Sequence, residues 1–410
     1  MIPTLSTPDS SLAFVADGYG YISRTCDRLG SDAFRTRILG MPVTMMRGGD
    51  AARVFYEGGR FNRHLSMPPS VSHLLQDLGS VQTLEDDSHR HRKAGFLELL
   101  FDGGDARLGE LFEEELGAAV ERWRGGPPVV LHDELGPLLA RAVFRWAGIP
   151  TLAPAEFRAR AGELSAMVER AGSFGPLNWL ARARRHRTER WAAGLVVAIR
   201  DGRVVPRAGS PLDAIARWTG DDGLPLSEDV AAVELLNLLR PTVAVVRFVE
   251  FAALALASRP AARSRLAAGD EEALAGFANE VRRRTPFFPV IAGRVRRPFR
   301  WSDHDFAPGD WVMLDIYGTN HDARLWAQPQ RFRPERYATE DARHIVAQGS
   351  GDYLDDHRCP GEPATNQLIA AALRVLARTP WRLEPGQDLG VTYSRMPAKV
   401  RSGLRIRFAG

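Results

Sequence analysis

Cys359 constrains the fold of this chain more than any other residue, because it lies between a glycine-rich loop and a predicted helix. The chain reads His-Arg-Cys-Pro-Gly-Glu over residues 357–362, and a helical pattern follows over residues 366–378. Free backbone N–H groups and the positive end of the helix dipole favour the thiolate of a cysteine at this position. Gly361 lets the backbone approach a flat ligand closely. The alternative is an inert core thiol, which is the usual state of an isolated cysteine.

Most of the remaining chain shows the periodicity of helices. Helices are predicted over residues 97–122, 181–200, 227–258 and 274–284. Strand-like segments are short and comprise residues 42–46, 293–301 and 311–316, with a small C-terminal hairpin over residues 391–408. The sequence therefore predicts a mainly α fold, rich in helices, with small peripheral β-sheets.

The whole chain, residues 1–410, is predicted to form a single domain, because no linker, repeat or low-complexity tract divides it. Its net charge is +4, and nearly all of its Lys and Arg residues are arginines. An arginine-rich stretch over residues 182–190 could indicate a nucleic-acid patch. Since no binding motif accompanies it, a solvated helix face is the better interpretation, and we expect no nucleic-acid partner.

Cysteine usage and apolar patterning favour a cytoplasmic protein without a membrane span. Cys26 and Cys359 show neither metal-binding nor disulfide spacing. The most apolar stretch, residues 230–258, is interrupted by charged side chains, so it is not expected to cross a membrane. The first residues carry neither a basic segment nor a long apolar run, so no signal peptide is expected.

Two further motifs precede Cys359 in a fixed order. Glu280 and Arg283 form an E-x-x-R pair on a predicted helix, and residues 334–337 read Pro-Glu-Arg-Tyr. Each motif is weak alone, since E-x-x-R is also an ordinary surface pair. Their order and spacing, followed by the glycine-rich loop and the cysteine, resemble the cytochrome P-450 superfamily.

The resemblance implies a haem enzyme with the cytochrome P-450 fold. Cys359 would be the axial thiolate ligand of the iron of haem b, where it would favour cleavage of an O–O bond. Glu280, Arg283 and Arg336 would form a buried ion network on the proximal side of the haem. Such a network stays charged only if its members are mutually paired.

Two departures from ordinary members narrow the resemblance. The loop over residues 348–358 is long and lacks the usual phenylalanine, and the central helix reads Leu-Arg-Pro-Thr over residues 239–242 in place of an acid–alcohol pair. Both features resemble the fatty-acid peroxygenase branch, which uses hydrogen peroxide directly. The likeness is carried by residues 17–19, 52–56, 81–84, 89–93 and 240–241.

Arg240 supports this likeness on physical grounds. None of its neighbours one helical turn away is acidic; they are Leu236, Asn237, Val243 and Ala244. A buried guanidinium is costly without a carboxylate, and a substrate carboxylate would satisfy it with two parallel hydrogen bonds. A carboxylate from elsewhere in the fold is the structural alternative. Pro241 removes a helical hydrogen bond, so a kink is expected there.

The likeness also implies contacts with the haem propionates. His89 and Lys93 stand four residues apart on a predicted helix, so they share one face, and two cations suit two carboxylates. Arg294 and His357 are further candidates for these contacts. A solvated basic face is the alternative for His89 and Lys93.

Gln82 and Phe287 would contact the substrate beside Arg240. Glutamine is typical of hydroxylating members where histidine is associated with decarboxylation, so Gln82 favours hydroxylation; a simple loop hydrogen bond is its alternative role. Gln76 and Arg284 stand where relatives usually carry aromatic residues. They leave open a shorter or more functionalised acid.

The predicted function is a haem-thiolate peroxygenase that hydroxylates a carboxylic acid, such as a fatty acid, at its α or β carbon. Arg240, Pro241 and Gln82 are the catalytic candidates, with the substrate carboxylate as the acid–base group. Hydrogen peroxide would be the oxidant and no redox partner would be required. The alternatives are decarboxylation to a terminal alkene, oxidation of a more polar secondary-pathway acid, a monooxygenase fed by a ferredoxin-type partner, and a haem sensor without turnover.

Overall fold

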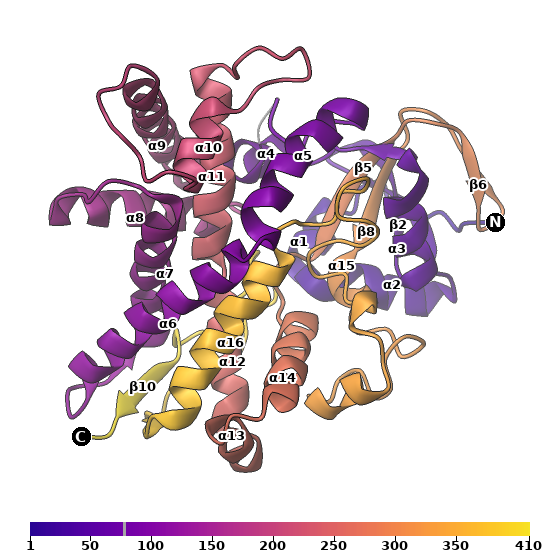
Figure 1. Ribbon diagram of the computed structural model, residues 1–410. Coiled ribbons are helices and arrows are strands. Elements are labelled where there is room, and N and C mark those ends of the chain that lie inside the picture. Colours follow the sequence, from indigo (N-terminus) through magenta and orange to yellow (C-terminus); the bar gives the residue numbers. More distant parts are fainter. Residues whose placement is uncertain (77–78) are drawn as a thin grey trace.

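Helices make up most of the molecule, and the largest sheet lies to one side of them, near the N-terminus (Figure 1). The computed structural model describes residues 1–76 and 79–410. The predicted mainly α fold with small sheets is confirmed.

The longer helices are α5 (Asp86–Phe101), α6 (Gly104–Trp123), α7 (Leu131–Ala147), α8 (Pro154–Glu169), α9 (Pro176–Arg200), α11 (Glu228–Ala244), α12 (Val246–Ala257), α14 (Glu271–Arg284) and α16 (Glu362–Arg378). The shorter ones are α1 (Ser11–Asp17), α2 (Tyr21–Leu29), α3 (Gly49–Tyr56), α4 (Pro69–Leu75), α10 (Pro211–Arg217), α13 (Pro260–Ala267) and α15 (Ile316–Thr319). Short 3-10 helices cover Gly18–Gly20, Glu57–Gly59, Pro334–Ala338 and Ala342–His344.

The strands of the described residues form three sheets. The largest has the order β1-β2-β8-β5-β3 and consists of β1 (Ala33–Ile38), β2 (Met41–Met46), β3 (Phe61–Asn62), β5 (Val290–Val295) and β8 (Trp311–Asp315). β4 (Val129–Val130), β10 (Arg405–Phe408) and β9 (Trp381–Leu383) form the second, and β6 (Phe299–Trp301) and β7 (His304–Phe306) form the third. β2 and β8, which are parallel neighbours, match the predicted segments 42–46 and 311–316 to within one residue.

Two strand predictions are corrected. The segment 293–301 is not one strand, because β5 ends at Val295 and β6 begins at Phe299 in a separate sheet. The C-terminal hairpin predicted over residues 391–408 is wrong. Val391 and Val400 meet in an isolated bridge, while β10 pairs with β4 and β9 from earlier in the chain.

The helix predicted over residues 97–122 is two helices, α5 and α6. Gly103 between them has φ of +80°, a backbone conformation that favours glycine. At Gly104, a Cβ atom would lie 1.8 Å from the Leu99 carbonyl oxygen, so the start of α6 approaches the end of α5 too closely for a side chain. The chain turns here because two glycines permit a fold-back that the apolar periodicity does not reveal.

The central helix is interrupted at Val245, between α11 and α12, four residues after Pro241. The kink expected at Pro241 itself stays a prediction. α11 continues through Pro241, and the Val245 N–H donates to the Thr242 carbonyl oxygen at 3.1 Å in a tighter turn. Pro241 lacks a backbone N–H donor. The helical hydrogen bonds change from i−4 to i−3 acceptors only in the next turn, at Val245. The largest apolar core surrounds this helix, with buried side chains from α6, α7, α11, α12 and α16.

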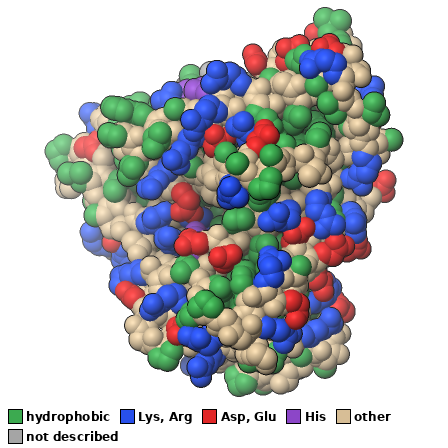
Figure 2. Space-filling model, turned by 90° about the vertical axis from the view of Figure 1, so that its left-hand side faces the viewer, with side chains coloured by type: hydrophobic (Ala, Val, Ile, Leu, Met, Phe, Trp, Pro, Cys, Tyr) green, Lys and Arg blue, Asp and Glu red, His purple; other side chains and the backbone are tan. Residues whose placement is uncertain are grey.

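The arginine-rich segment lies on α9, which confirms the helix predicted over residues 181–200 and begins at Pro176. Arg185 and Arg187 of this helix pair with Glu189 and Glu163. Figure 2 views the molecule from the side of α8 and α9 and shows acidic side chains scattered among the basic ones. The positive charge on this face is therefore partly neutralised by neighbouring carboxylates.

Within the described residues, no single helix is long and apolar enough to cross a membrane. Residues 228–257 and α13 reach the length and apolar composition of a membrane span only when they are taken together. The two segments are bent by 112° at the break between them.

Candidate active site

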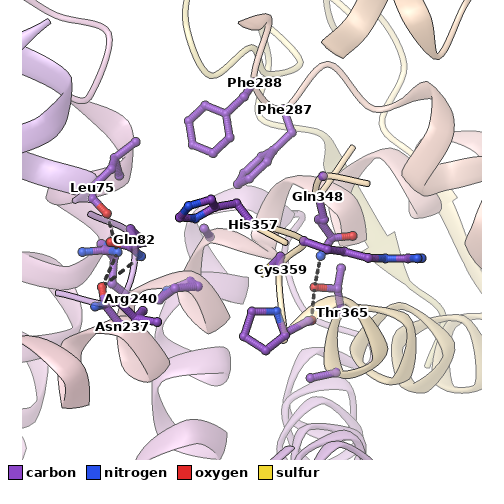
Figure 3. Close-up of a pocket in the computed structure, with 18 of the residues that line it drawn as sticks. Leu75, Gln82, Asn237, Arg240, Phe287, Phe288, Gln348, His357, Cys359 and Thr365 are labelled. Atoms are coloured by element: carbon purple, nitrogen blue, oxygen red, sulfur yellow. Dashed lines mark hydrogen bonds between the residues drawn. The ribbon is translucent and has the colours of Figure 1, made fainter. Parts of the chain in front are cut away.

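A cavity of about 350 Å³ lies between α11, α5 and the loop before α16. The sequence-predicted residues that line it are Gln82, His89, Lys93, Arg240, Pro241, Phe287, His357 and Cys359. Figure 3 shows Gln82 and Arg240 grouped on one side of the cavity, across from Cys359. The fold thus brings together side chains that lie far apart in the sequence, such as Gln82 and Cys359.

Cys359 reaches the cavity from the loop before α16. Its N–H donates to the Gln348 carbonyl oxygen at 2.9 Å, and the Gln348 amide donates to Thr365 Oγ1 of α16 at 2.7 Å. Burial raises the pKa of the Cys359 thiol, while the Gly361 N–H and the charge of Lys93 act in the opposite direction. The Gly361 N–H at the helix end thus acts in the expected direction, but burial outweighs it and the net pKa is raised. A metal ion bound to the sulfur would supply the charge that favours the thiolate.

A fully buried ion network joins α14 to the turn Pro334–Ala338. Arg283 donates to both oxygens of Glu280, at 2.9 and 2.7 Å, and Arg336 Nε lies 3.2 Å from Glu280 Oε2. The Tyr337 hydroxyl donates to the same carboxylate at 3.1 Å. Burial works against the charge of Glu280, but Arg283 and the other donors outweigh it and hold its pKa below the usual value. The ion network predicted from the E-x-x-R motif is confirmed.

A second buried group consists of the basic side chains of Arg63, His89, Lys93 and His357, and we call it the cavity cation cluster. All four line the cavity, and Arg63, His89 and Lys93 are each only 3% exposed. The rings of His89 and His357 lie 4.4 Å apart. Lys93 Nζ donates to two backbone carbonyl oxygens of the loop before Cys359, at 3.1 and 2.6 Å. The cluster therefore gathers its positive charge next to that loop.

The cavity cation cluster has little counter-charge. Burial, followed by the neighbouring His357 and Lys93, lowers the pKa of His89 to about 3. Burial also lowers the pKa of Lys93, to about 8, and that of Arg63. Among residues 1–76 and 79–410, one carboxylate contacts the cluster, through Glu85 Oε2 at 3.2 Å from His357 Nε2. An anionic group in the cavity would stabilise the charges of Arg63 and Lys93 and would favour protonation of the two histidines.

Arg240 lies on the opposite wall, on the buried face of α11, and is 3% exposed. Its Nη2 donates to the Leu75 carbonyl oxygen at 2.7 Å and to Asn237 Oδ1 at 2.9 Å. Gln82 Nε2 donates to the same Asn237 oxygen at 3.2 Å. Figure 3 shows these three side chains and Leu75 as one hydrogen-bonded group. A guanidinium fixed in a mostly apolar cavity is suited to bind a carboxylate.

Aromatic side chains form the apolar part of the cavity. Phe287 packs against Phe248 and Phe288, with ring centroids 5.0 and 4.4 Å apart. Gln76 lines the cavity as the sequence suggested, whereas Arg284 is not among the described lining residues. The cavity thus combines an apolar wall with a few polar groups, as ligand pockets commonly do.

Comparisons with known proteins decide the family. A cytochrome P450 family profile matches residues 274–363. Cytochrome P450SP alpha (CYP152B1), solved in complex with (R)-ibuprofen, is 40% identical, with 98% of each chain covered and a TM-score of 0.93. This chain belongs to the cytochrome P450 superfamily.

The same structural likeness places this P450 in the fatty-acid peroxygenase branch. Cytochrome P450EX alpha (CYP152N1), solved with myristic acid, is 34% identical, covering 99% of this chain and 98% of its own, with a TM-score of 0.93. Rabbit cytochrome P450 4A7 (Oryctolagus cuniculus) is 29% identical over 31% of this chain, and that alignment covers a quarter (25%) of the rabbit protein. This P450 is therefore a haem-thiolate oxidoreductase whose haem iron has a cysteine thiolate ligand.

The residues of the cavity fit a haem. Cys359 is the cysteine that reaches the cavity, because Cys26 is buried elsewhere, in the apolar cluster beside β1 and β2. Among the described residues, Arg63 Nη1 is buried without a hydrogen-bond partner, which suits a propionate oxygen. At Gly349, which has φ of +94°, a Cβ atom would lie 3.2 Å from the Tyr56 ring, so only glycine leaves this part of the loop room. The set of one thiol and four basic side chains suits an iron and two carboxylates.

Arg294 is not brought to the cavity cation cluster of this P450. It lies on β5, partly exposed, with its guanidinium over the Trp311 ring at 5.1 Å. On the neighbouring strand β3, Asn62 pairs with Arg294, and the next residue, Arg63, faces the cavity instead. The likeness to relatives therefore located this pair of strands but not the arginine that enters the cavity.

Sequence reasoning missed Arg63, Glu234 and Asn237. Arg63 belongs to no motif, so nothing in the sequence distinguishes it from other arginines. Glu234, Asn237 and Arg240 offer a usable signal, because three polar residues recur at intervals of three in an otherwise apolar helix and so share one face.

Proposed function

We propose that this P450 uses hydrogen peroxide to hydroxylate a carboxylic acid at the α or β carbon. The observation that carries the proposal is Arg240 on the wall of the same cavity as Cys359. The relatives solved with (R)-ibuprofen and myristic acid, which are both carboxylic acids, support an acid as the substrate. A redox partner is not required under this proposal.

Arg240 would bind the substrate carboxylate through charge-assisted hydrogen bonds. Its guanidinium is held by the Leu75 carbonyl and by Asn237, so it is ordered before the acid arrives. An acid held at its carboxylate presents the carbons next to the carboxyl group to the oxidising centre first. The position of Arg240 across the cavity from Cys359 therefore favours oxidation at the α or β carbon over the far end of the chain.

The substrate carboxylate would also handle the protons. Peroxide must lose a proton from one oxygen and regain one on the oxygen that leaves, and a carboxylate at hydrogen-bond distance can do both. On α11, the Thr242 hydroxyl donates to the Leu238 carbonyl oxygen at 2.9 Å, so it is engaged by its own helix. The substrate acid fills the role that the missing acid–alcohol pair plays in ordinary members.

The haem, when bound, supplies the oxidising chemistry at its iron. Cys359 Sγ would ligate the iron, while Arg63, His89, Lys93 and His357 would hold the propionates. Phe287 and Phe288 would keep water away from the apolar part of the substrate. Gln82, a glutamine where histidine is associated with decarboxylation, supports hydroxylation over loss of carbon dioxide.

A more functionalised acid is a second candidate substrate, because Gln76 adds a polar side chain to the cavity wall. A polar group on the acid would offer that amide a hydrogen-bond partner, which a purely apolar chain does not.

The test is product analysis with the purified holoenzyme, hydrogen peroxide and a panel of carboxylic acids of different length and polarity. The matched controls are the methyl esters of the same acids, which keep the carbon chain and lose the charge. Hydroxylated products from the acids and little from the esters are expected. Turnover only with NAD(P)H and electron-transfer proteins, or equal oxidation of the esters, would refute the proposal.

A further inference from the structure

Glu234 lies on α11, six residues before Arg240, and its side chain is fully buried. Its Oε1 accepts hydrogen bonds from Arg92 Nη1 at 2.7 Å and from the Val81 N–H at 2.9 Å. Its Oε2 accepts from Asn237 Nδ2 at 2.8 Å. Asn237 lines the cavity, whereas Glu234 is not among the described residues that do.

The bond from Asn237 to Glu234 sets the polarity of the Asn237 amide. An amide has a donor end and an acceptor end, so Nδ2 directed at Glu234 leaves Oδ1 directed away from it. That oxygen accepts from Gln82 Nε2 at 3.2 Å and from Arg240 Nη2 at 2.9 Å. Figure 3 shows both bonds converging on Asn237. Glu234 therefore acts through Asn237, because it determines that the Asn237 oxygen, and not the Asn237 nitrogen, faces Gln82 and Arg240.

We propose that Glu234 is a positioning residue, which acts through Asn237 to orient Arg240 and Gln82 toward the substrate acid. It also holds the backbone of the loop that carries Gln82, through the Val81 N–H. The proposal rests on the proposed function, since the ligand that Arg240 receives is the carboxylic acid.

The role requires a carboxylate and not only a side chain of that size. In Glu234→Gln, one end of the new amide becomes a donor. If that end faces Asn237, the Asn237 amide must rotate and present its own N–H groups to Arg240, donor against donor. If it faces Arg92 and Val81 instead, two donors oppose it there. Each arrangement leaves buried donors unsatisfied, so the group around Arg240 must move.

The experiment measures binding of myristic acid to the holoenzyme from the change in the Soret band, without peroxide. Glu234→Gln should weaken binding about tenfold or more, as expected for the loss of a hydrogen bond to a charged group. The turnover number should fall as well, and the ratio of α- to β-hydroxylated product should change, because the carboxylate is also displaced. Glu163→Gln is the matched control, as Glu163 is another buried carboxylate, on α8, that binds Arg160 and Thr188.

A double-mutant cycle separates positioning from a general structural role. Asn237→Leu removes the middle of the relay and should weaken acid binding by a similar factor. Adding Glu234→Gln to Asn237→Leu should then change binding little further, because the path to Arg240 is already broken. Additive effects of the two substitutions would overturn the proposal. If Glu234→Gln does not fold, Asn237→Leu decides alone, and unchanged acid binding in that variant also overturns it.

Crystal structures of the wild-type and Glu234→Gln holoenzymes give a readout that does not depend on the substrate. Rotation of the Asn237 amide and displacement of the Arg240 guanidinium are expected, and an unchanged group would overturn the proposal. If the wild type binds no acid or lacks peroxide-driven turnover, the proposed function fails, while these structures still decide whether Glu234 orients Arg240.

Discussion

The cavity cation cluster and a second buried cluster differ in how their charges are matched. The second, which we call the helix ion cluster, joins α7, α8 and α12 through His132, Glu169, Arg247 and Glu250. His132 Nδ1 lies 2.9 Å from Glu250 Oε2, and its Nε2 lies 3.2 Å from Glu169 Oε1. Arg247 donates to Glu169 at 2.7 Å, and Arg395 also pairs with Glu169. Cations and carboxylates alternate in this cluster.

The histidines of the two clusters respond to burial in opposite ways. Burial opposes the charge of His132, but the hydrogen bonds with Glu169 and Glu250 outweigh it and raise the pKa. At His89 burial prevails, aided by His357 and Lys93, and the pKa falls to about 3. Burial alone therefore does not distinguish a functional site. A buried set of basic side chains with little counter-charge suits an anionic ligand, whereas a set with matched charges indicates a structural role.

The comparison depends on the haem lying at the cavity cation cluster, and the largest predicted effect tests this. The reduced wild-type protein with carbon monoxide should show the red-shifted Soret band of thiolate ligation. Cys359→Ser should lose that band completely, because serine provides no thiolate. Cys26→Ser, the matched control in the apolar cluster beside β1 and β2, should keep it. The same spectrum in Cys359→Ser as in the wild type would show that another group ligates the iron.

Breaking the helix ion cluster should cost stability and leave the haem site intact. Glu169→Gln removes the carboxylate that pairs with Arg247, which is fully buried, and should lower the free energy of unfolding by roughly 3–5 kcal/mol. Asp305→Asn, which breaks the exposed pair with Arg300, should cost less than about 1 kcal/mol. Urea unfolding of the holoenzymes provides the measurement. Equal costs for the two substitutions would remove the distinction between a matched buried cluster and a surface pair.

Breaking the cavity cation cluster should have the converse effect, on haem retention more than on stability. Arg63→Met should speed transfer of haem to an acceptor protein roughly tenfold to a hundredfold, as for the loss of a hydrogen bond to a charged group. Arg294→Met is the control, because Arg294 does not reach the cavity and should retain haem as the wild type does. Faster haem loss from Arg294→Met than from Arg63→Met would reverse our assignment of the propionate contacts.

The smallest predicted effect is a pH dependence of stability from His132. Its pKa is raised in the folded protein above the ordinary value of 6.5, so folding favours the protonated form. This contribution is fully present below about pH 6.5 and is lost as the pH rises through the folded-state pKa. The stability difference between wild type and His132→Gln should therefore shrink from pH 6 toward alkaline pH. A difference that grows over this range would mean that His132 is held neutral.

The sequence predicts the residues whose chemistry is local. Cys359 is identified by its position before a helix, and Arg240 by its place in an apolar helix without acidic neighbours. Glu280 and Arg283 of the E-x-x-R pair lie one helical turn apart. Their two hydrogen bonds can therefore be predicted from the sequence. The E-x-x-R pair and the helical neighbours of Arg240 lie within about four residues of one another, whereas the assignment of Cys359 also uses the order of the motifs over residues 280–359.

The parts that could not be predicted depend on contacts between distant segments. Arg63, rather than Arg294, enters the cavity because of the register of β3 against β5. Glu234 is a helix residue whose role appears only when Arg92 and Val81 meet it from 142 and 153 positions away. The raised pKa of the Cys359 thiol likewise follows from burial by the whole fold, which outweighs the local effect of the helix end.

The central claim is that Arg240 fixes a substrate carboxylate that also transfers the protons of peroxide. The decisive measurement is the peroxide-driven rate on the preferred acid for wild type, Arg240→Ala and Arg240→Lys. Arg240→Ala should lose roughly 2–5 kcal/mol of transition-state stabilisation, or about one and a half to three and a half powers of ten in kcat/KM. Arg240→Lys should retain only part of the activity, since an ammonium cannot form the paired hydrogen bonds of a guanidinium.

The same measurement is repeated with acetate and a substrate that has no acid group. Acetate should bind beside Arg240 in the wild type and enable oxidation of that substrate, and it should help Arg240→Ala much less. Loss of acid oxidation in Arg240→Ala, together with acetate-dependent activity confined to proteins that keep Arg240, is the result that we predict. Wild-type rates in Arg240→Ala on the acid would contradict the account and leave Arg240 with a structural role only.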